Sequence, residues 1–369
     1  MRDAVIRVPS WFEDRTKQRR SVFMHMRMAL IPLLICALMC AALSGCSQQP
    51  PAETTCAHQY DRAESAGVFQ DKVAVCTCRL CGDAYSETVA PATKSIKILA
   101  IGNSFNNNSS SLLYELAQAA GAEEIVIGCL WIGGSALEQH AANIQSGAKA
   151  YEYRKNTTGK WVVRQNYNFL QGLKDEEWDY ICINQQSISA GLPEEYDKGL
   201  DVVGRYIREN MPADCQLWFN MTWGYDADYT ANPNFMKYYD GDPRKHYEAI
   251  SDTCRTTVMD SGWFDGLVPC GTTIQNMRSS WAADLITQDG YHASSHLGCY
   301  ALGLTWLATW TDIDVAAMTY FPRMGTKWGL PYEEALREIA KEAVLNAMAE
   351  PFEPAASKYT EKPAFQEKH

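Results

Sequence analysis

The sequence predicts an α/β protein: a three-layer α/β/α sandwich around a mostly parallel sheet, preceded by a small cysteine-rich module. From Ser95 onward, short apolar runs alternate with segments of helical periodicity, which predicts the sandwich. The chain has 369 residues, 46% of them hydrophobic, which is enough for a large core. Four closely spaced cysteines before Ser95 predict the module.

The apolar runs predict the strands of the main domain, and the segments of helical periodicity predict its helices. The apolar runs that predict strands are 96–101, 124–130, 180–183, 216–220 and 266–268. The segments that predict helices are 111–120, 196–209, 243–259 and 331–348. Strands that alternate with helices favour a parallel sheet covered on both faces, and such sheets bind ligands at the carboxyl ends of their strands.

The composition of the chain changes along its length, and the changes predict its organisation. The predicted segments are a signal peptide (1–45), a tether (46–54), the cysteine-rich module (55–89), a linker (90–94), the main domain (95–313), a helical extension packed on it (314–352) and a polar tail (353–369).

The first segment has the pattern of an export signal. An apolar run, 29–43, follows several arginines, as in a signal peptide. It has about fifteen residues, fewer than the roughly 20 that a membrane-spanning helix needs. The run ends in Leu43-Ser44-Gly45-Cys46, which resembles a bacterial lipobox. This resemblance implies that Cys46 is lipidated and that the protein is exported and anchored on the extracytoplasmic side of a membrane. An uncleaved anchor is the alternative.

The charge of the chain bears on its partners. Lys and Arg number 33 against 44 Asp and Glu, for a net charge of −11. A protein that binds nucleic acid needs a basic surface to neutralise phosphates. The sequence therefore predicts no nucleic-acid partner.

The module carries a pattern of metal ligands. Cys56 and His58 precede Cys76-Thr-Cys78-Arg-Leu-Cys81-Gly82, and a C-x-x-C-G turn places two thiolates on one knuckle, as zinc sites require. The segment resembles short zinc-ribbon-like repeats of bacterial surface proteins. That resemblance implies a structural zinc on Cys56, His58, Cys78 and Cys81. Cys76 leaves the choice of four ligands open, and four cysteines in an exported protein also suit two disulfides.

A candidate nucleophile follows the first predicted strand. Ser104, in Gly102-Asn103-Ser104-Phe105, is placed on the turn into a helix, where backbone N–H groups favour a developing anion. Far downstream, Asp289 and His292 are three residues apart and can hydrogen-bond on one turn. An aspartate that orients a histidine, which in turn deprotonates a serine, makes a nucleophile from an otherwise weak hydroxyl. The second glycine of G-x-S-x-G is missing, which argues against an α/β-hydrolase.

In this order, the two motifs resemble those of SGNH/GDSL-type hydrolases, and most closely an uncharacterised, DUF4886-like bacterial lipoprotein subfamily. The resemblance covers about 95–312 and extends towards 352. It implies a flavodoxin-like sheet, ester hydrolysis through an acyl-serine at Ser104, Asp289 and His292, and no catalytic cofactor.

The resemblance also implies an oxyanion hole. Its donors would be the backbone N–H of Ser104, that of Gly134 (with Gly133 as the alternative), and a carboxamide after a later strand. The last position reads Asn184-Gln185-Gln186, which departs from the family's G-x-N-D pattern. We assign Asn184, and Gln185 and Gln186 remain open, because the chemistry needs only an amide N–H aimed at the oxyanion.

Aromatic and amide residues suggest how substrate binds. Trp223 lies in a segment rich in both, and aromatic faces beside amides suit sugar rings; packing in the core is the alternative. We predict that Trp223 and Gln185 contact substrate. The function predicted is that of a surface lipoprotein esterase that hydrolyses acyl esters, notably acetyl esters, of carbohydrate. The alternatives are a non-catalytic carbohydrate-binding or adhesion lipoprotein, and a lipase or thioesterase on the same fold.

Overall fold

A computed structural model describes residues 56–367 of the chain. The predicted signal peptide, the lipidation at Cys46 and the tether lie outside these residues. The described residues form a three-stranded sheet and a seven-stranded sheet with helices on both sides of the larger one. Within residues 56–367, no helix combines the length and the apolar character needed to cross a bilayer.

The large sheet has the strand order β10-β9-β8-β4-β5-β6-β7. Its strands are β4 (Ser95–Gly102), β5 (Glu124–Trp131), β6 (Tyr151–Asn156), β7 (Trp161–Tyr167), β8 (Tyr180–Ile183), β9 (Gln216–Asn220) and β10 (Gly266–Val268). All pairs from β10 to β5 are parallel. In chain order these five strands run 2-1-3-4-5, the flavodoxin-like order. The predicted fold class is therefore confirmed. The chain adds strands on one side of β4 first (β5) and then on the other side (β8, β9 and β10), so the strand order reverses between β4 and β8.

Two antiparallel strands, β6 and β7, extend the sheet beyond β5 and were not predicted. In β6, Tyr151 and Tyr153 are buried and alternate with the partly exposed Glu152 and Arg154. The hairpin therefore has no continuous apolar run, which is the signal that predicted the parallel strands.

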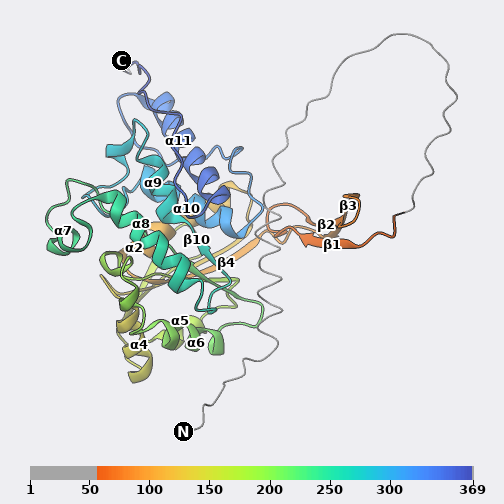
Figure 1. The fold of residues 1–369 in the computed structure, drawn as a ribbon, viewed down its shortest axis with the longest axis horizontal. Helices are drawn as coiled ribbons and strands as arrows, with labels where there is room; N and C mark the ends of the chain where they lie inside the picture. The colour runs from red at the N-terminus through yellow and green to blue at the C-terminus, as the bar shows by residue number, and fades with distance from the viewer. Residues whose placement is uncertain (1–55, 368–369) are drawn as a thin grey trace, which may run out of the picture. The chain divides into compact units, whose positions relative to one another are not determined.

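Helices cover both faces of this sheet (Figure 1). One face carries α2 (Ser104–Ser110), α3 (Leu113–Ala119), α7 (Pro233–Tyr239), α9 (Cys270–Met277), α10 (Leu297–Trp310) and α11 (Gly329–Ala349). The other carries α4 (Leu137–Ser146), α5 (Phe169–Leu173), α6 (Leu200–Asn210) and α8 (Pro243–Thr253). Shorter turns are η2 (Ser187–Ser189), η3 (Pro193–Glu195), η4 (Cys254–Val258) and η5 (Ala283–Leu285).

The core alternates along each strand, as the pleat of a sheet covered on both faces requires. In β4, Ile98 and Ala100 face the layer of α10, whereas Leu99 and Ile101 face the layer of α6. Helix α10 is buried along almost its whole length. It has no polar stripe, so its sequence lacks the amphipathic period by which a surface helix is found.

The three-stranded sheet consists of β1 (Tyr60–Glu64), β2 (Lys72–Cys78) and β3 (Ala84–Ala90), all antiparallel. Most of its side chains are exposed, and the buried positions are concentrated in β2. The loop between β1 and β2 is fixed by Asp312, whose carboxylate accepts the N–H groups of Phe69 at 2.8 Å and Gln70 at 3.0 Å.

Two histidines are fully buried, His140 on α4 and His246 on α8. Burial lowers the pKa of His140 to about 4 and that of His246 to about 3. In the unfolded chain a histidine takes up its proton near pH 6.5. The stability that comes from the neutral rings is therefore complete above about pH 6.5 and is lost as the pH falls towards 4.

We predict that this loss reaches about 1.4 kcal/mol per pH unit for each histidine. Urea titrations between pH 6 and pH 4.5 measure it as the slope of the free energy of unfolding against pH. His246→Asn should reduce that slope by this amount, even though it also lowers stability overall. The control is Tyr247→Phe, a buried position on the same helix, which should lower stability without changing the slope because it removes no group that titrates in this pH range. Equal slopes in His246→Asn and the unsubstituted protein would contradict the prediction.

Candidate active site

The site begins where β4 ends, at Gly102. Its φ is +148°, and a Cβ atom there would lie 2.0 Å from Oδ1 of Asn184, so only glycine fits. Asn103 follows in an extended conformation, and its Oδ1 accepts the N–H of Phe105 at 3.0 Å, which starts α2. Ser104 is therefore the first residue of α2, directly beyond the carboxyl end of the strand.

The structure brings the three predicted catalytic residues together. The Ser104 Oγ lies 2.8 Å from Nε2 of His292, and Nδ1 of the same ring lies 2.7 Å from Oδ2 of Asp289. The other oxygen of Asp289 accepts the backbone N–H of His292 at 2.8 Å. The His292 side chain is 21% exposed, so the group is open to solvent on one side. This is the geometry of a serine, its general base and the carboxylate that orients the base.

The carboxylate of Asp289 is held in its charged form. Partial burial raises its pKa, but the hydrogen bonds from the His292 ring and from the N–H groups of His292 and Tyr291 outweigh this, and the net pKa is lowered. An ionised carboxylate only accepts hydrogen bonds. It therefore keeps the proton of neutral His292 on Nδ1 and leaves Nε2 to accept the hydroxyl proton of Ser104.

Trp223 anchors the turn that carries this histidine. Its ring is fully buried and stacks on Phe105 with centroids 4.2 Å apart. Its Nε1–H donates to the carbonyl of Tyr291 at 2.7 Å. The prediction that Trp223 contacts a sugar is wrong, because the core covers both ring faces; packing, the alternative, is what the structure shows.

A partly buried ion pair supports the same turn. Arg278 contacts Asp226 at 2.8 Å and donates to the carbonyls of Gly224 at 2.6 Å and Tyr225 at 2.9 Å. The N–H of Asp226 donates to the carbonyl of Gly290 at 2.7 Å, inside the Asp289–His292 turn. Burial raises the pKa of Asp226 and lowers that of Arg278, while their mutual attraction opposes both shifts. The sequence analysis did not identify Asp226 as part of the site, because it lies far from Gly290 in the sequence and no motif surrounds it.

The structure does not place Asn184 and Gln185 as predicted. The two Nδ2 hydrogens of Asn184 go to Oδ1 of Asn103 at 3.0 Å and to the carbonyl of Gln185 at 2.8 Å, so neither is available to an oxyanion. The Oε1 of Gln185 accepts the N–H groups of Leu137 at 3.0 Å and Gln186 at 2.9 Å. Both side chains are fully buried. Asn184 as oxyanion donor and Gln185 as substrate contact are therefore corrected: both residues brace the loops.

Gln186 is the remaining carboxamide of this segment, and it is partly exposed. Its Nε2 donates to the carbonyl of Gly134 at 2.8 Å. Gly134 is exposed, has a φ of +64° and has open space where a side chain would lie. The turn at Gly133 and Gly134 and the Gln186 side chain therefore lie together, as the donors of one anion site would.

The comparisons with known proteins agree with this fold. The family model described as "Domain of unknown function (DUF4886)" matches residues 97–328. The chain belongs to this DUF4886 family. A DUF4886 family protein from Bacteroides uniformis, known from a crystal structure, is 32% identical to this chain, with a TM-score of 0.67. The aligned region covers 72% of this chain and 100% of the Bacteroides uniformis chain. No curated protein matches the chain significantly.

Two more distant structures are similar to this DUF4886 chain. A Slackia heliotrinireducens protein assigned provisionally to the SGNH hydrolases is 20% identical over 58% of this chain and 98% of that chain, with a TM-score of 0.39. A catalytic mutant of Axe2, an acetylxylan esterase from Geobacillus stearothermophilus, is 12% identical, with a TM-score of 0.37. That match covers 59% of this chain and 97% of the esterase chain. Because these scores are low, the fold assignment rests on the strand order described above.

The predicted metal ligands of this DUF4886 chain also lie together. One ligand atom from each of Cys56, His58, Cys78 and Cys81 lies within 4.8 Å of all the others. Cys76, which left the choice of ligands open in the sequence, is not in this group. It is buried in β2.

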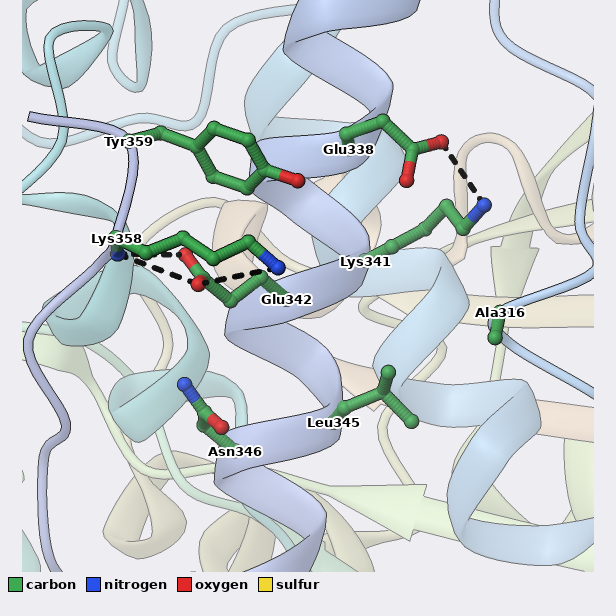
Figure 2. A pocket seen from close by; sticks show the side chains of 8 residues that line it. All are labelled: Ala316, Glu338, Lys341, Glu342, Leu345, Asn346, Lys358 and Tyr359. Carbon is green, nitrogen blue, oxygen red and sulfur yellow. Dashed lines mark hydrogen bonds and ion pairs between the residues drawn. The ribbon is translucent and has the colours of Figure 1, made fainter. Parts of the chain in front are cut away.

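A pocket of about 320 Å³ lies along α11, and its lining contains none of the candidate catalytic residues (Figure 2). Its charged groups contact one another. Lys341 pairs with Glu338 at 2.9 Å, and Glu342 accepts the hydroxyl of Ser357 at 2.6 Å and the N–H of Lys358 at 3.2 Å. These bonds attach the C-terminal segment to α11, which is a structural role.

Proposed function

We propose that this DUF4886 protein is a serine esterase that works through an acyl-serine intermediate. The observation that carries the proposal is the continuous hydrogen-bonded chain from Ser104 through His292 to Asp289, with links of 2.8 and 2.7 Å. It lies where the strand order reverses between β4 and β8, which is where doubly wound sheets bind their ligands.

The geometry supports a two-step reaction. Ser104 Oγ attacks the ester carbonyl while its proton passes to Nε2 of His292, and Asp289 stabilises the imidazolium. The tetrahedral intermediate collapses when His292 returns the proton to the leaving alcohol, which leaves the acyl group on Ser104. A water molecule then repeats the attack, with His292 again as the base, and releases the carboxylic acid and free Ser104.

The oxyanion would be bound between three donors. The N–H of Ser104 opens α2 and so has no partner four residues back in its own helix. The N–H of Gly134 lies on the exposed turn next to Gln186. Gln186 Nε2 carries two hydrogens, and the bond to the Gly134 carbonyl uses one of them. We propose that the second hydrogen binds the oxyanion, in place of Asn184, because Gln186 was one of the alternatives that the sequence left open.

For the substrate we propose an acyl ester of carbohydrate with a small acyl group such as acetyl. The support is a pair of partly exposed tyrosines beside the catalytic histidine. The Tyr291 ring lies 3.9 Å from the His292 ring, and Tyr229 lies 4.8 Å from Tyr291, measured between centroids. Tyrosine rings offer an apolar face with a polar edge, which suits a sugar. The cell-surface lipoprotein location rests on the sequence pattern around Cys46 and is part of the same proposal.

The catalytic role predicts that Ser104→Ala reduces hydrolysis of p-nitrophenyl acetate to background. Asp289→Asn should reduce kcat by roughly 10⁴-fold, because the wrong histidine tautomer is then favoured. A fluorophosphonate should label Ser104, as shown by peptide mass spectrometry. Ser111→Ala, a matched change one residue beyond α2, should keep full activity. If Ser104→Ala and the unsubstituted protein hydrolyse the ester at the same rate, the protein is not a serine esterase.

The oxyanion assignment predicts that Gln186→Met lowers kcat/KM by about 10²–10³-fold, since one donor to the transition state is lost. The loss should fall on kcat, with KM and the thermal midpoint little changed, because methionine keeps the length of the side chain. Gln118→Met, at an exposed position on α3, is the control. Full activity in Gln186→Met would remove Gln186 from the site.

The substrate assignment predicts that Tyr229→Ala raises KM for acetylated xylo-oligosaccharides by roughly tenfold, about 1.4 kcal/mol of binding free energy. The same variant should hydrolyse p-nitrophenyl acetate normally, because that ester has no sugar to stack. Tyr229→Phe should restore the KM, and Tyr238→Ala, at an exposed position on α7, should not change it. An equal effect on both esters would show that Tyr229 supports the loop and does not bind sugar.

A further inference from the structure

We propose that His246, buried on α8, is a positioning residue that fixes the proposed oxyanion donor Gln186 relative to the loop that holds the Asp289–His292 turn. The proposal deepens the proposed function and rests on it, because Gln186 has a donor role only in an esterase. It draws on the hydrogen bonds of the His246 ring, on the packing around that ring, and on the two loops that the ring connects.

The two nitrogens of His246 bond to two different loops. Nδ1 accepts the backbone N–H of Tyr225 at 3.2 Å, in the loop after β9. Nε2 donates to the carbonyl of Ser187 at 3.2 Å, in the segment after β8. A backbone N–H can only donate and a carbonyl can only accept, so the ring is neutral and carries its hydrogen on Nε2. Burial, which lowers the pKa of His246 to about 3, favours the same neutral form.

A second hydrogen bond holds the segment after β8 at the same place. Ser187 directly follows Gln186, and its Oγ lies 2.8 Å from the hydroxyl of Tyr225. Ser187 is therefore connected to Tyr225 by two routes, one direct and one through the ring of His246. Both Ser187 and Tyr225 are buried. Movement of this segment away from the loop after β9 would break both contacts and would leave buried polar groups unsatisfied.

The loop after β9 also places the candidate base. The N–H of Asp226, the residue after Tyr225, donates to the carbonyl of Gly290 at 2.7 Å, inside the Asp289–His292 turn. An oxyanion donor works at about 2.7–3.1 Å from the oxyanion, while the base must reach other oxygens of the same intermediate. The spacing between the proposed oxyanion donor and the base therefore depends on Tyr225, the residue to which His246 binds.

The packing around His246 makes the ring a rigid link. The ring is fully buried, stacks on Tyr239 with centroids 4.0 Å apart, and makes an edge contact with Tyr225 at 4.8 Å between centroids. At Gly224, a Cβ atom would lie 2.8 Å from the carbonyl oxygen of Pro243, at the start of α8. The loop after β9 therefore approaches this helix so closely that only glycine fits at that position, and the link has little room to move.

Packing alone does not explain a histidine at this position. An imidazole costs free energy to bury unless its nitrogens are hydrogen-bonded, and an apolar ring would fill the space without that cost. A buried polar network whose bonds are all made fixes one arrangement of the groups that it joins. His246 is not a catalytic residue, because both nitrogens are occupied and the side chain is not exposed to substrate. It acts through Ser187 on the neighbouring Gln186.

The first measurement compares variants of the full chain on p-nitrophenyl acetate, at a temperature well below the thermal midpoint of each. His246→Phe keeps a ring but loses both hydrogen bonds. It should lower kcat about tenfold, part of the roughly 10²–10³-fold that an oxyanion donor supplies, and should leave KM within about twofold. His246→Gln offers an amide acceptor and donor at a similar spacing and should recover most of kcat. Tyr247→Phe, the matched control on α8, loses a hydroxyl that contacts Thr272 and Phe352 and should keep full kcat.

The second measurement shows whether His246 acts through Gln186. Gln186→Met combined with His246→Phe should lose no more kcat than Gln186→Met alone, because a donor that has been removed can no longer be misplaced. Ser187→Ala is a smaller change that removes only the hydroxyl contact with Tyr225. It should lower kcat about threefold and show the same lack of additivity with Gln186→Met. The acid limb of the kcat/KM profile, which reports protonation of the base, should not move in His246→Phe.

Three results would overturn the proposal. They are full kcat in both His246→Phe and Ser187→Ala, losses that multiply when His246→Phe is combined with Gln186→Met, and a shifted acid limb, which would mean that His246 acts on the base. Failure of the esterase itself is distinguishable. An inactive Ser104→Ala beside a fully active His246→Phe and Ser187→Ala refutes the positioning role alone, whereas a Ser104→Ala variant as active as the unsubstituted protein refutes the esterase and the positioning role with it.

Discussion

The side chain of Asn103 connects the three loops that make up the candidate site. Its Oδ1 accepts the N–H of Phe105 and Nδ2 of Asn184, and its Nδ2 donates to the carbonyls of Ser135 and Gln185. The residue is 2% exposed, so each of these bonds replaces one that water would otherwise make. A shorter or apolar side chain would leave several buried polar groups without partners at once. The position of Ser104 relative to the Gly134 turn and the segment after β8 depends on this one carboxamide.

The histidine is placed by a different part of the molecule. Trp223 and Asp226, both from the loop after β9, bind the backbone of the Asp289–His292 turn, and Arg278 binds the backbone of that loop. The candidate nucleophile and base are therefore carried by different sets of contacts. The two sets meet at the 2.8 Å bond between Ser104 and His292, at the stacking of Trp223 on Phe105, and at the bond from the N–H of Ala293 to Oδ1 of Asn108 at 3.3 Å. The loops after β4 and β9 leave parallel strands of one sheet at the same end, with β8 between them, which helps to fix the distance between the two sets.

Sequence patterns were sufficient to predict the functional residues that come directly after a strand or that lie a few residues apart in the chain. The strands that end at Gly102, Ile183, Asn220 and Val268 were predicted within a residue or two, and Ser104, Asp289 and His292 lie together at hydrogen-bonding distance. The errors have a common cause. Asn184, Gln185 and Trp223 carry the expected groups, but long-range hydrogen bonds decide which way an amide or indole points, and these bonds link residues far apart in the chain. The β6–β7 hairpin and α10 were missed because one lacks an apolar run and the other lacks a polar face.

The presence of Asp289 and His292 on one short turn has a consequence for how the site tolerates change. The bond between their side chains spans three residues of chain and is reinforced by the backbone N–H of His292 on the same carboxylate. Its length is therefore insensitive to small movements of the helices and strands around it. The bond from His292 to Ser104 spans 188 residues, and its length depends on contacts between residues far apart in the chain, such as the stacking of Phe105 on Trp223. Substitutions that accumulate across the domain would disturb this second distance first, so the alignment of base and nucleophile is the most fragile dimension of the site.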